Sequence, residues 1–241
     1  MTITEATANT LTLGVLERSH QSFELLASMI ERRESNETLV RRDQLETEGL
    51  STQPFWETPG DMEGDTYREY ISIHPEFDLT VRTGVLERLK KATRLLPGDW
   101  QMVIKAGFRP YAVQLAVLEA FLEQSRQTHP ERNETQHLQH ARTFVADPSI
   151  VCPAHTTGGA VDVDIKNTET GEYIDMGCPP NTDDERAFLH SDLISSVQHK
   201  NRMILLDAML AAGFAPNPHE WWHYQYGETY WAAFYGHKTT L

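Results

Sequence analysis

The chain has 241 residues, of which 39% are apolar and 23% are charged, a composition that is typical of a globular protein and excludes a disordered chain. Its 35 acidic and 21 basic residues give a formal net charge of -14. A chain this acidic repels a phosphate backbone, so we expect no nucleic-acid partner.

The sequence shows no targeting or membrane segment. Its first residues, MTITEATANT, lack the basic segment and apolar run of a secretory signal. No stretch approaches the roughly 20 apolar residues of a membrane span. We therefore expect a cytoplasmic protein with no membrane partner. Cys152 and Cys178 are too few for a disulfide framework, and we expect two free thiols.

The N-terminal part differs in pattern from the rest. Apolar residues recur at roughly helical spacing between Leu11 and Ile30, and the charged run ERRESNETLVRRD follows them. This predicts a helical N-terminal extension over residues 1–48 and a main domain over residues 49–241. Residues 49–66 are rich in Gly, Pro, Asp and Thr, which favours an irregular segment where that domain begins.

Helix and strand patterns alternate in the next part of the chain. Leucines at helical spacing predict a helix over residues 83–96, which the following Pro-Gly pair ends. A short strand is expected over residues 100–106 and a second helix over residues 111–125. Arg109 therefore lies at a strand-to-helix junction.

A polar stretch over residues 126–149 follows. His137 and His140 are three residues apart, which places them on one face if this stretch is helical. No acidic or cysteine partner is arranged nearby to complete a metal site. A solvated surface is the favoured interpretation.

The segment Gly159 to Ile165 alternates in polarity. Asp162 and Asp164 point to one face, and Val161 and Val163 point to the other. This predicts a half-buried strand with carboxylates on one face. Either aspartate can reach a cation there, and spacing does not decide between them.

The C-terminal part predicts one more helix and one more strand. The helix, residues 201–213, ends on a glycine, and Pro216 and Pro218 then enforce a loop before a strand over residues 221–226. Strands interleaved with irregularly spaced helices predict an α+β fold with a small, mainly antiparallel sheet.

Two segments together supply the residues of a metal hydrolase, which needs about three protein ligands and a nearby carboxylate to accept a proton from water. H-T-T-G-G-A-V-D carries His155 and two aspartates, and E-W-W-H carries Glu220 and His223. Residues three apart on a regular strand face opposite sides. Glu220 must therefore lie at a bulge or in the loop before the strand, and we expect the loop.

The motifs G-F-R-P, H-T-T-G-G-A-V-D, D-M-G and E-W-W-H-Y, in this order, resemble the zinc D-alanyl-D-alanine dipeptidases of the type that confers vancomycin resistance and their wider family of zinc D-Ala-D-Ala peptidases. The resemblance covers roughly residues 50–235. It implies the α+β fold shared with hedgehog-type domains, a catalytic domain within residues 49–241, one zinc ion per chain and a small D-amino-acid dipeptide as substrate.

The resemblance also implies a role for each motif residue. His155, Asp162 and His223 match the zinc ligands, and Glu220 matches the general base. Arg109 matches the arginine that stabilises the carbonyl oxygen as it becomes anionic, a role that suits a permanently charged side chain with several donors. A structural salt bridge at a helix start is the alternative for Arg109.

Three positions depart from the family pattern. Pro153 stands in place of a serine, and Ala106 stands in place of an aspartate that can pair with Arg109. Asn181 stands where the family has an aspartate that receives the dipeptide ammonium. This neutral residue keeps two alternatives open: a carboxypeptidase or endopeptidase acting on longer cell-wall peptides, and a non-catalytic module stabilised by zinc.

Overall fold

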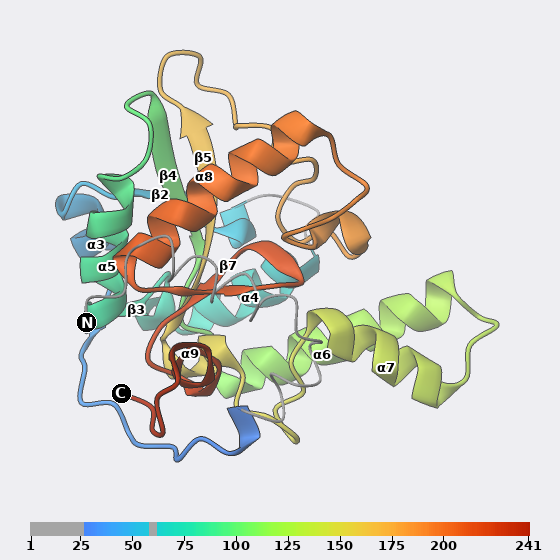
Figure 1. The fold of residues 1–241 in the computed structure, drawn as a ribbon. Coiled ribbons are helices and arrows are strands. Elements are labelled where there is room, and N and C mark those ends of the chain that lie inside the picture. The colour runs from blue at the N-terminus through green and yellow to red at the C-terminus, as the bar shows by residue number, and fades with distance from the viewer. Residues whose placement is uncertain (1–26, 58–61) are drawn as a thin grey trace. The chain divides into compact units, whose positions relative to one another are not determined.

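The computed structural model describes residues 27–57 and 62–241 (Figure 1). Contacts divide the described residues into two units, residues 36–226 and a smaller unit in which residues 27–35 group with residues 227–241. The smaller unit contains α9 (Thr229–Tyr235) and a β-bridge between Glu31 and Thr239. The larger unit contains, in chain order, β1 (Leu39–Val40), α3 (Arg42–Thr47), β2 (Ser51–Thr52), η1 (Phe55–Glu57), α4 (Met62–Ile73), η2 (Pro75–Phe77), β3 (Val81–Arg82), α5 (Thr83–Thr93), β4 (Trp100–Ala106), α6 (Tyr111–Thr128), α7 (Glu134–Phe144), η3 (Ala154–Thr157), β5 (Ala160–Asn167), η4 (Glu185–Ala187), α8 (Ser196–Ala212), β6 (Ala215–Asn217) and β7 (Glu220–Gln225).

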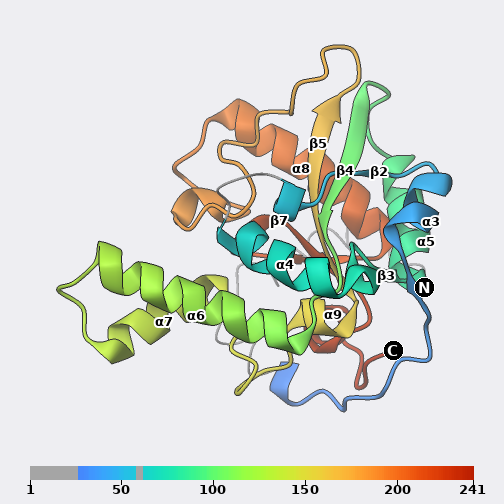
Figure 2. The same ribbon diagram turned by 180° about the vertical axis from the view of Figure 1, so that it is seen from behind.

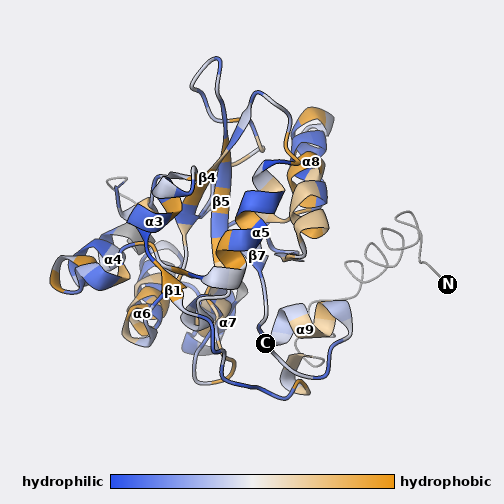
Figure 3. Cartoon of the chain, turned by 90° about the vertical axis from the view of Figure 1, so that its left-hand side faces the viewer, coloured by the Kyte–Doolittle hydropathy of each residue, from blue (hydrophilic) through white to orange (hydrophobic). Residues whose placement is uncertain are grey.

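A five-stranded sheet forms the centre of the larger unit. Its strand order is β2-β4-β5-β7-β6, in which β2 runs parallel to β4 and every other pairing is antiparallel. Strands β4 and β5 lie between α8 on one side and α4 and α6 on the other (Figure 3). Figures 1 and 2 show the same arrangement from opposite sides. The predicted α+β class with a small, mainly antiparallel sheet is confirmed.

Strand β5 is more deeply buried than its alternating sequence predicted. Residues 160–165 are all buried, including Asp162 and Asp164, so the expectation of a half-buried strand is wrong. The reason is tertiary, because β5 is the central strand of the sheet and pairs with β4 and β7 on either side. Its carboxylates consequently lie inside the protein, where a carboxylate needs a compensating partner.

Several predicted elements are confirmed. The strand over residues 100–106 is β4, and the helices expected over residues 83–96 and 111–125 are α5 and α6. Helix α8 begins before the expected residue 201 and ends at Ala212, and the Gly213 that caps it adopts the left-handed conformation with φ 95°. No helix in the described part of the chain has the length and apolar character needed to cross a bilayer.

The described residues cover only part of the predicted N-terminal extension. Most of the helix expected between Leu11 and Ile30 lies outside the described residues, and the extension over residues 1–48 stays a prediction. Within that range, β1 pairs with β3, and α3 follows. The segment over residues 49–66, expected to be irregular, contains β2 and η1 and leads into α4.

Helices α6 and α7 form an antiparallel hairpin (Figure 2). One of the histidines expected at a solvated surface is buried between them. His137 is buried, and its Nδ1 lies 2.9 Å from the hydroxyl of Ser125, so the solvated interpretation is wrong for it. The sequence spacing did place the histidines on a helix. The burial of His137 depends on the packing of α7 against α6, which the local sequence pattern does not reveal.

The turn after β4 passes very close to the chain before β3. A Cβ placed on Gly107 lies 2.3 Å from the carbonyl oxygen of Thr80 and 2.9 Å from Val81 Cγ1. The amide of Phe108 also donates to the Thr80 carbonyl. Only glycine fits at this crossing, which places Arg109 next to the first histidine of the site described below.

We predict that Gly107→Ala lowers the free energy of unfolding by about 1–3 kcal/mol, because the backbone at Thr80 must shift to admit a methyl group. Gly98→Ala is the matched control, since nothing lies within 4 Å of a Cβ at that position. Equilibrium urea unfolding of both variants measures the difference. Equal stability of the two variants contradicts the close approach at Gly107.

Candidate metal centre

Three buried side chains from distant parts of the chain converge on one point. The ligand atoms of His155, Asp162 and His223 all lie within 4.8 Å of one another. His155 Nε2 is 3.3 Å from Asp162 Oδ2 and 3.1 Å from His223 Nδ1, which in turn is 3.0 Å from Asp162 Oδ1. The structure therefore brings together the three residues that the sequence proposed as ligands.

Strand pairing and one tight turn produce this convergence. In the antiparallel register of β5 and β7, Asp162 stands directly opposite His223. His155 lies in η3, which ends at Gly158 in the left-handed conformation with φ 71°. This turn reverses the chain into β5, so that the imidazole of His155 reaches the strand that follows it.

The orientation of the His155 ring is set by a backbone acceptor. Nδ1 of His155 lies 2.7 Å from the carbonyl oxygen of Gly107 and donates to it. This contact fixes the tautomer that leaves Nε2 with a lone pair directed at Asp162 and His223. A histidine that binds a metal typically has such an outer partner on its other nitrogen.

Burial and charge hold the cluster in the protonation states that bind a cation. Burial lowers the pKa of His155 and outweighs the attraction of Asp162, which favours the neutral imidazole. Burial acts to raise the pKa of Asp162, but the neighbouring histidines outweigh it and hold that pKa well below its usual range. A neutral imidazole and an ionised carboxylate are both metal-binding forms.

The residues present fit a zinc ion. Oδ1 of Asp162 is buried and accepts no hydrogen bond within the described part of the chain. An unsatisfied buried carboxylate oxygen is costly, and a cation at the centre of the three ligands satisfies it. Two imidazole nitrogens and one carboxylate oxygen form a ligand set that zinc accepts in catalytic sites, with a fourth position left for water.

Asp164, which the sequence left as an alternative ligand, is outside this cluster. Its Oδ1 accepts the backbone amide of Ile165 at 2.8 Å, and burial raises its pKa to about 7. Lys105 and Lys166 act in the opposite direction, lowering that pKa through charge. Asp162 is the aspartate that faces both histidines.

Glu220 lies beside the cluster at the start of β7. Its Oε2 is 3.6 Å from His223 Nδ1, and its side chain is 15% exposed. The loop position expected for Glu220 is wrong. It is the first residue of β7, and the register of β6 and β7 shifts at this point, which brings residues three apart to the same side.

Arg109 lies next to the His155 side of the cluster. Its backbone amide donates to the carbonyl of His155 at 3.1 Å, and its buried guanidinium contributes to the lowered pKa of His155. Nη1 of Arg109 donates to Oε1 of Gln114 at 3.1 Å. The Gln114 amide in turn donates to the carbonyl of Ala146 at 2.8 Å.

Sequence reasoning missed Gln114 as a partner of Arg109. Gln114 is buried, and it occupies the first turn of α6, five residues after the arginine. A polar residue within the apolar stripe of a predicted helix was the available signal. Its neutral amide contacts Arg109, as the family's aspartate at the position of Ala106 was expected to do.

The remaining positions singled out in the sequence are not part of the three-residue cluster. Pro153 is the residue before η3, and Asn181 has a left-handed backbone with φ 63°. Cys152 and Cys178 are both free, as predicted. Cys178 lies 3.5 Å from the guanidinium of Arg202 and takes no part in the cluster.

The α+β fold, the three convergent ligands and the adjacent carboxylate define an α+β protein with a candidate catalytic metal centre. A family model described as D-ala-D-ala dipeptidase, Peptidase_M15, matches residues 79–239. The chain belongs to this family, and it is a peptidase.

Curated relatives carry the same description. The chain is 28% identical over 190 residues to a D-alanyl-D-alanine dipeptidase of Synechocystis, covering 66% of this chain and 73% of that protein. It is 28% identical over 138 residues to one of Enterococcus faecalis, covering 52% of this chain and 63% of that protein. A solved vancomycin-resistance D,D-pentapeptidase in complex with Zn(II) matches 61% of this chain and 73% of its own at 18% identity, with a TM-score of 0.40, a likeness too low to support an inference.

We predict that Asp162→Asn removes stoichiometric metal from the purified protein, because a neutral amide is a much weaker ligand and the two histidines alone do not complete the site. Asp164→Asn is the matched control on the same strand and should keep its metal. Elemental analysis after dialysis measures both variants. Loss of metal from Asp164→Asn alone contradicts the ligand set.

Proposed function

We propose that this protein is a zinc-dependent dipeptidase that hydrolyses D-Ala-D-Ala or a related D-configured dipeptide. The convergence of His155, Asp162 and His223, with Glu220 beside them, is the observation that carries the proposal. Family membership and the names of the curated relatives support the substrate class. The cytoplasmic location expected from the sequence stays a prediction.

Glu220 is proposed as the general base. Zinc held by the three ligands supplies Lewis acidity, which lowers the pKa of water towards ~7 and polarises a peptide carbonyl. Glu220 accepts a proton from the attacking water and returns it to the leaving amine, for which a carboxylate at the edge of the site is well placed. Its partial exposure lets both water and the leaving amine reach the same carboxylate.

Arg109 is proposed to stabilise the carbonyl oxygen as it becomes anionic. Its guanidinium is buried, permanently charged and already held by the Gln114 amide. A donor that is fixed before the reaction stabilises developing charge without reorganisation. Because Gln114 is neutral, it positions the guanidinium and leaves its charge intact. An aspartate at position 106, where this chain has Ala106, would neutralise part of that charge.

A second candidate function is cleavage of longer cell-wall peptides by a carboxypeptidase or endopeptidase activity. It is favoured by Asn181, a neutral residue where the family pattern has a carboxylate for the dipeptide ammonium. An ion pair to an ammonium contributes about 1.5–3 kcal/mol, which corresponds to roughly ten- to a hundredfold in affinity. A substrate without a free amino terminus loses nothing from this replacement.

We predict that Glu220→Gln lowers kcat for D-Ala-D-Ala by about 10²–10⁴-fold, because the amide cannot accept the proton, while zinc stays bound. Release of D-alanine and zinc content are measured for both proteins. N-acetyl-D-Ala-D-Ala, run in parallel, identifies the carboxypeptidase alternative if it is the better substrate. Zinc binding without turnover of either substrate contradicts the proposed peptidase activity.

A further inference from the structure

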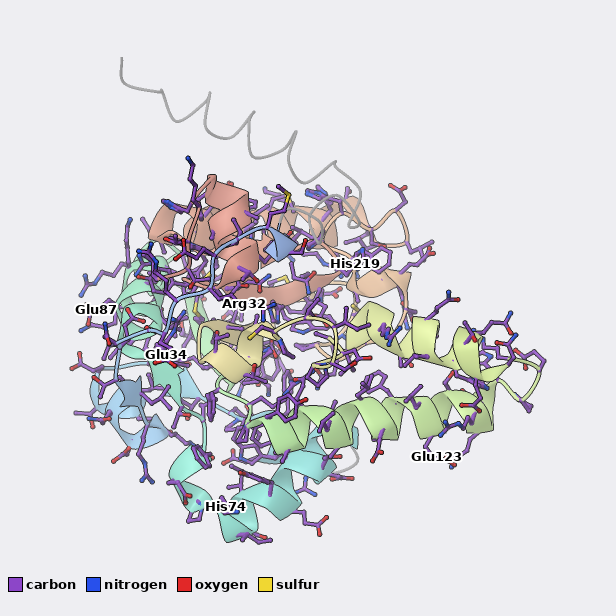
Figure 4. All side chains as sticks on the ribbon, turned by 90° about the horizontal axis from the view of Figure 1, so that it is seen from below. Arg32, Glu34, His74, Glu87, Glu123 and His219 are labelled. Atoms are coloured by element: carbon purple, nitrogen blue, oxygen red, sulfur yellow. The ribbon has the colours of Figure 1, made fainter. Side chains whose placement is uncertain are left out.

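Strands β6 and β7 are joined by a two-residue turn, Pro218-His219, and the residues on either side of it, Asn217 and Glu220, are paired partners in the sheet. His219 is labelled in Figure 4. Across this turn, the Nδ2 amide of Asn217 donates to Oε2 of Glu220 at 2.8 Å. The same oxygen lies 3.6 Å from the metal-cluster atom His223 Nδ1. Asn217 therefore holds the side of the carboxylate that lies nearest the metal cluster.

The other end of the Asn217 amide fixes which atom faces Glu220. Oδ1 of Asn217 accepts the backbone amide of His219 at 3.0 Å. A flipped amide would oppose its NH₂ group to that backbone donor and its oxygen to the carboxylate, which loses both hydrogen bonds. The turn therefore presents a donor, and only a donor, to Glu220.

The turn itself is anchored on a neighbouring segment. The amide of Leu189 donates to the carbonyl of Pro218 at 3.0 Å, and the ring of Phe188 stacks on His219 with centroids 4.8 Å apart. A hydrogen bond and a ring contact thus restrain both residues of the turn. The position of Asn217 is consequently set by tertiary contacts as well as by the hairpin.

That neighbouring segment is fixed by a buried cation on α8. Arg202 is fully buried, and its guanidinium donates to the carbonyls of Arg186, Phe188 and Met176. A guanidinium with several donors can saturate several carbonyls at once. The contacts run without a break from Arg202 through residues 186–189 to the turn, and from the turn through Asn217 to Glu220.

We propose that Asn217 is a positioning residue for Glu220, which it holds in the rotamer that addresses the substrate water. The role rests on the proposed function. A neutral amide suits it, because one N–H donor restrains a carboxylate and leaves other lone pairs for the transferred proton. A lysine or arginine in its place would form an ion pair that weakens the base.

Asn217→Asp is the strongest perturbation, because it keeps the oxygen that caps the turn but replaces the donor to Glu220 with a second carboxylate, which repels Glu220 from its position. Asn217→Ser is the neutral companion, since its hydroxyl can accept from the His219 amide. We expect both to lower kcat for D-Ala-D-Ala about tenfold or more, with KM and zinc content close to wild type, because a misplaced catalytic group costs rate more than binding. Asn133→Ser is the control, because Asn133 is also an asparagine that caps a backbone amide, at the start of α7. This variant should leave kcat unchanged.

A second readout does not depend on activity. In the metal-free protein, the melting temperatures of Asn217→Ser, Glu220→Ala and the double variant form a double-mutant cycle. A contact between the two side chains makes the double variant less destabilised than the sum of the single changes. Additive shifts overturn the proposal, as does unchanged kcat in Asn217→Asp. A joint fall of zinc content and kcat with a rise of KM reduces Asn217 to a turn-stabilising role and also overturns it.

The two readouts separate this proposal from the function on which it rests. If the wild-type protein cleaves neither dipeptide substrate, the proposed function fails, and the melting-temperature cycle still shows whether Asn217 and Glu220 are coupled. If wild type is active and the cycle is additive, the function stands and the positioning role fails.

Discussion

The antiparallel pairing of β5 with β7 is the constraint on which the rest of this site depends. It sets Asp162 opposite His223, which lie 61 positions apart in the chain, and so supplies two of the three candidate ligands from one register. Because side chains alternate along a strand, a slip of one residue would turn Asp162 away from the cluster. His155 joins them through the short turn at Gly158, and its Nδ1 contact with Gly107 connects the cluster to the end of β4.

Placing such a cluster inside a sheet carries a free-energy cost that the surrounding structure must offset. Asp162, His155 and His223 are all buried, and one oxygen of Asp162 accepts no hydrogen bond. Burying an ionised carboxylate is unfavourable even beside two histidines, and a cation held by the three side chains would offset that cost. Metal binding would therefore be coupled to the stability of this region, which is why the ligand substitutions are best assessed by metal content as well as by activity.

Two neutral amides recur beside the charged residues of the site. Gln114 holds the guanidinium of Arg109, and Asn217 holds the carboxylate of Glu220. In each case the amide also bonds to a backbone group, Ala146 O or His219 N, so its orientation is fixed. A neutral partner positions a charged group while preserving its charge, which is the property that both proposed roles require.

The sequence by itself determined the elements with strong local signals and pointed to the candidate site residues. Strand β4, helices α5, α6 and α8, and the residue types at His155, Glu220 and His223 followed from periodicity, stop signals and motif order, because these depend on neighbours in the chain. Strand spacing did not decide between Asp162 and Asp164, since both lie on one strand face. The resemblance favoured Asp162, and the pairing with β7 is what sets it opposite His223. The burial of His137, the strand position of Glu220 and the contacts of Asn217 were also decided by tertiary structure, because each depends on how one element packs or registers against another.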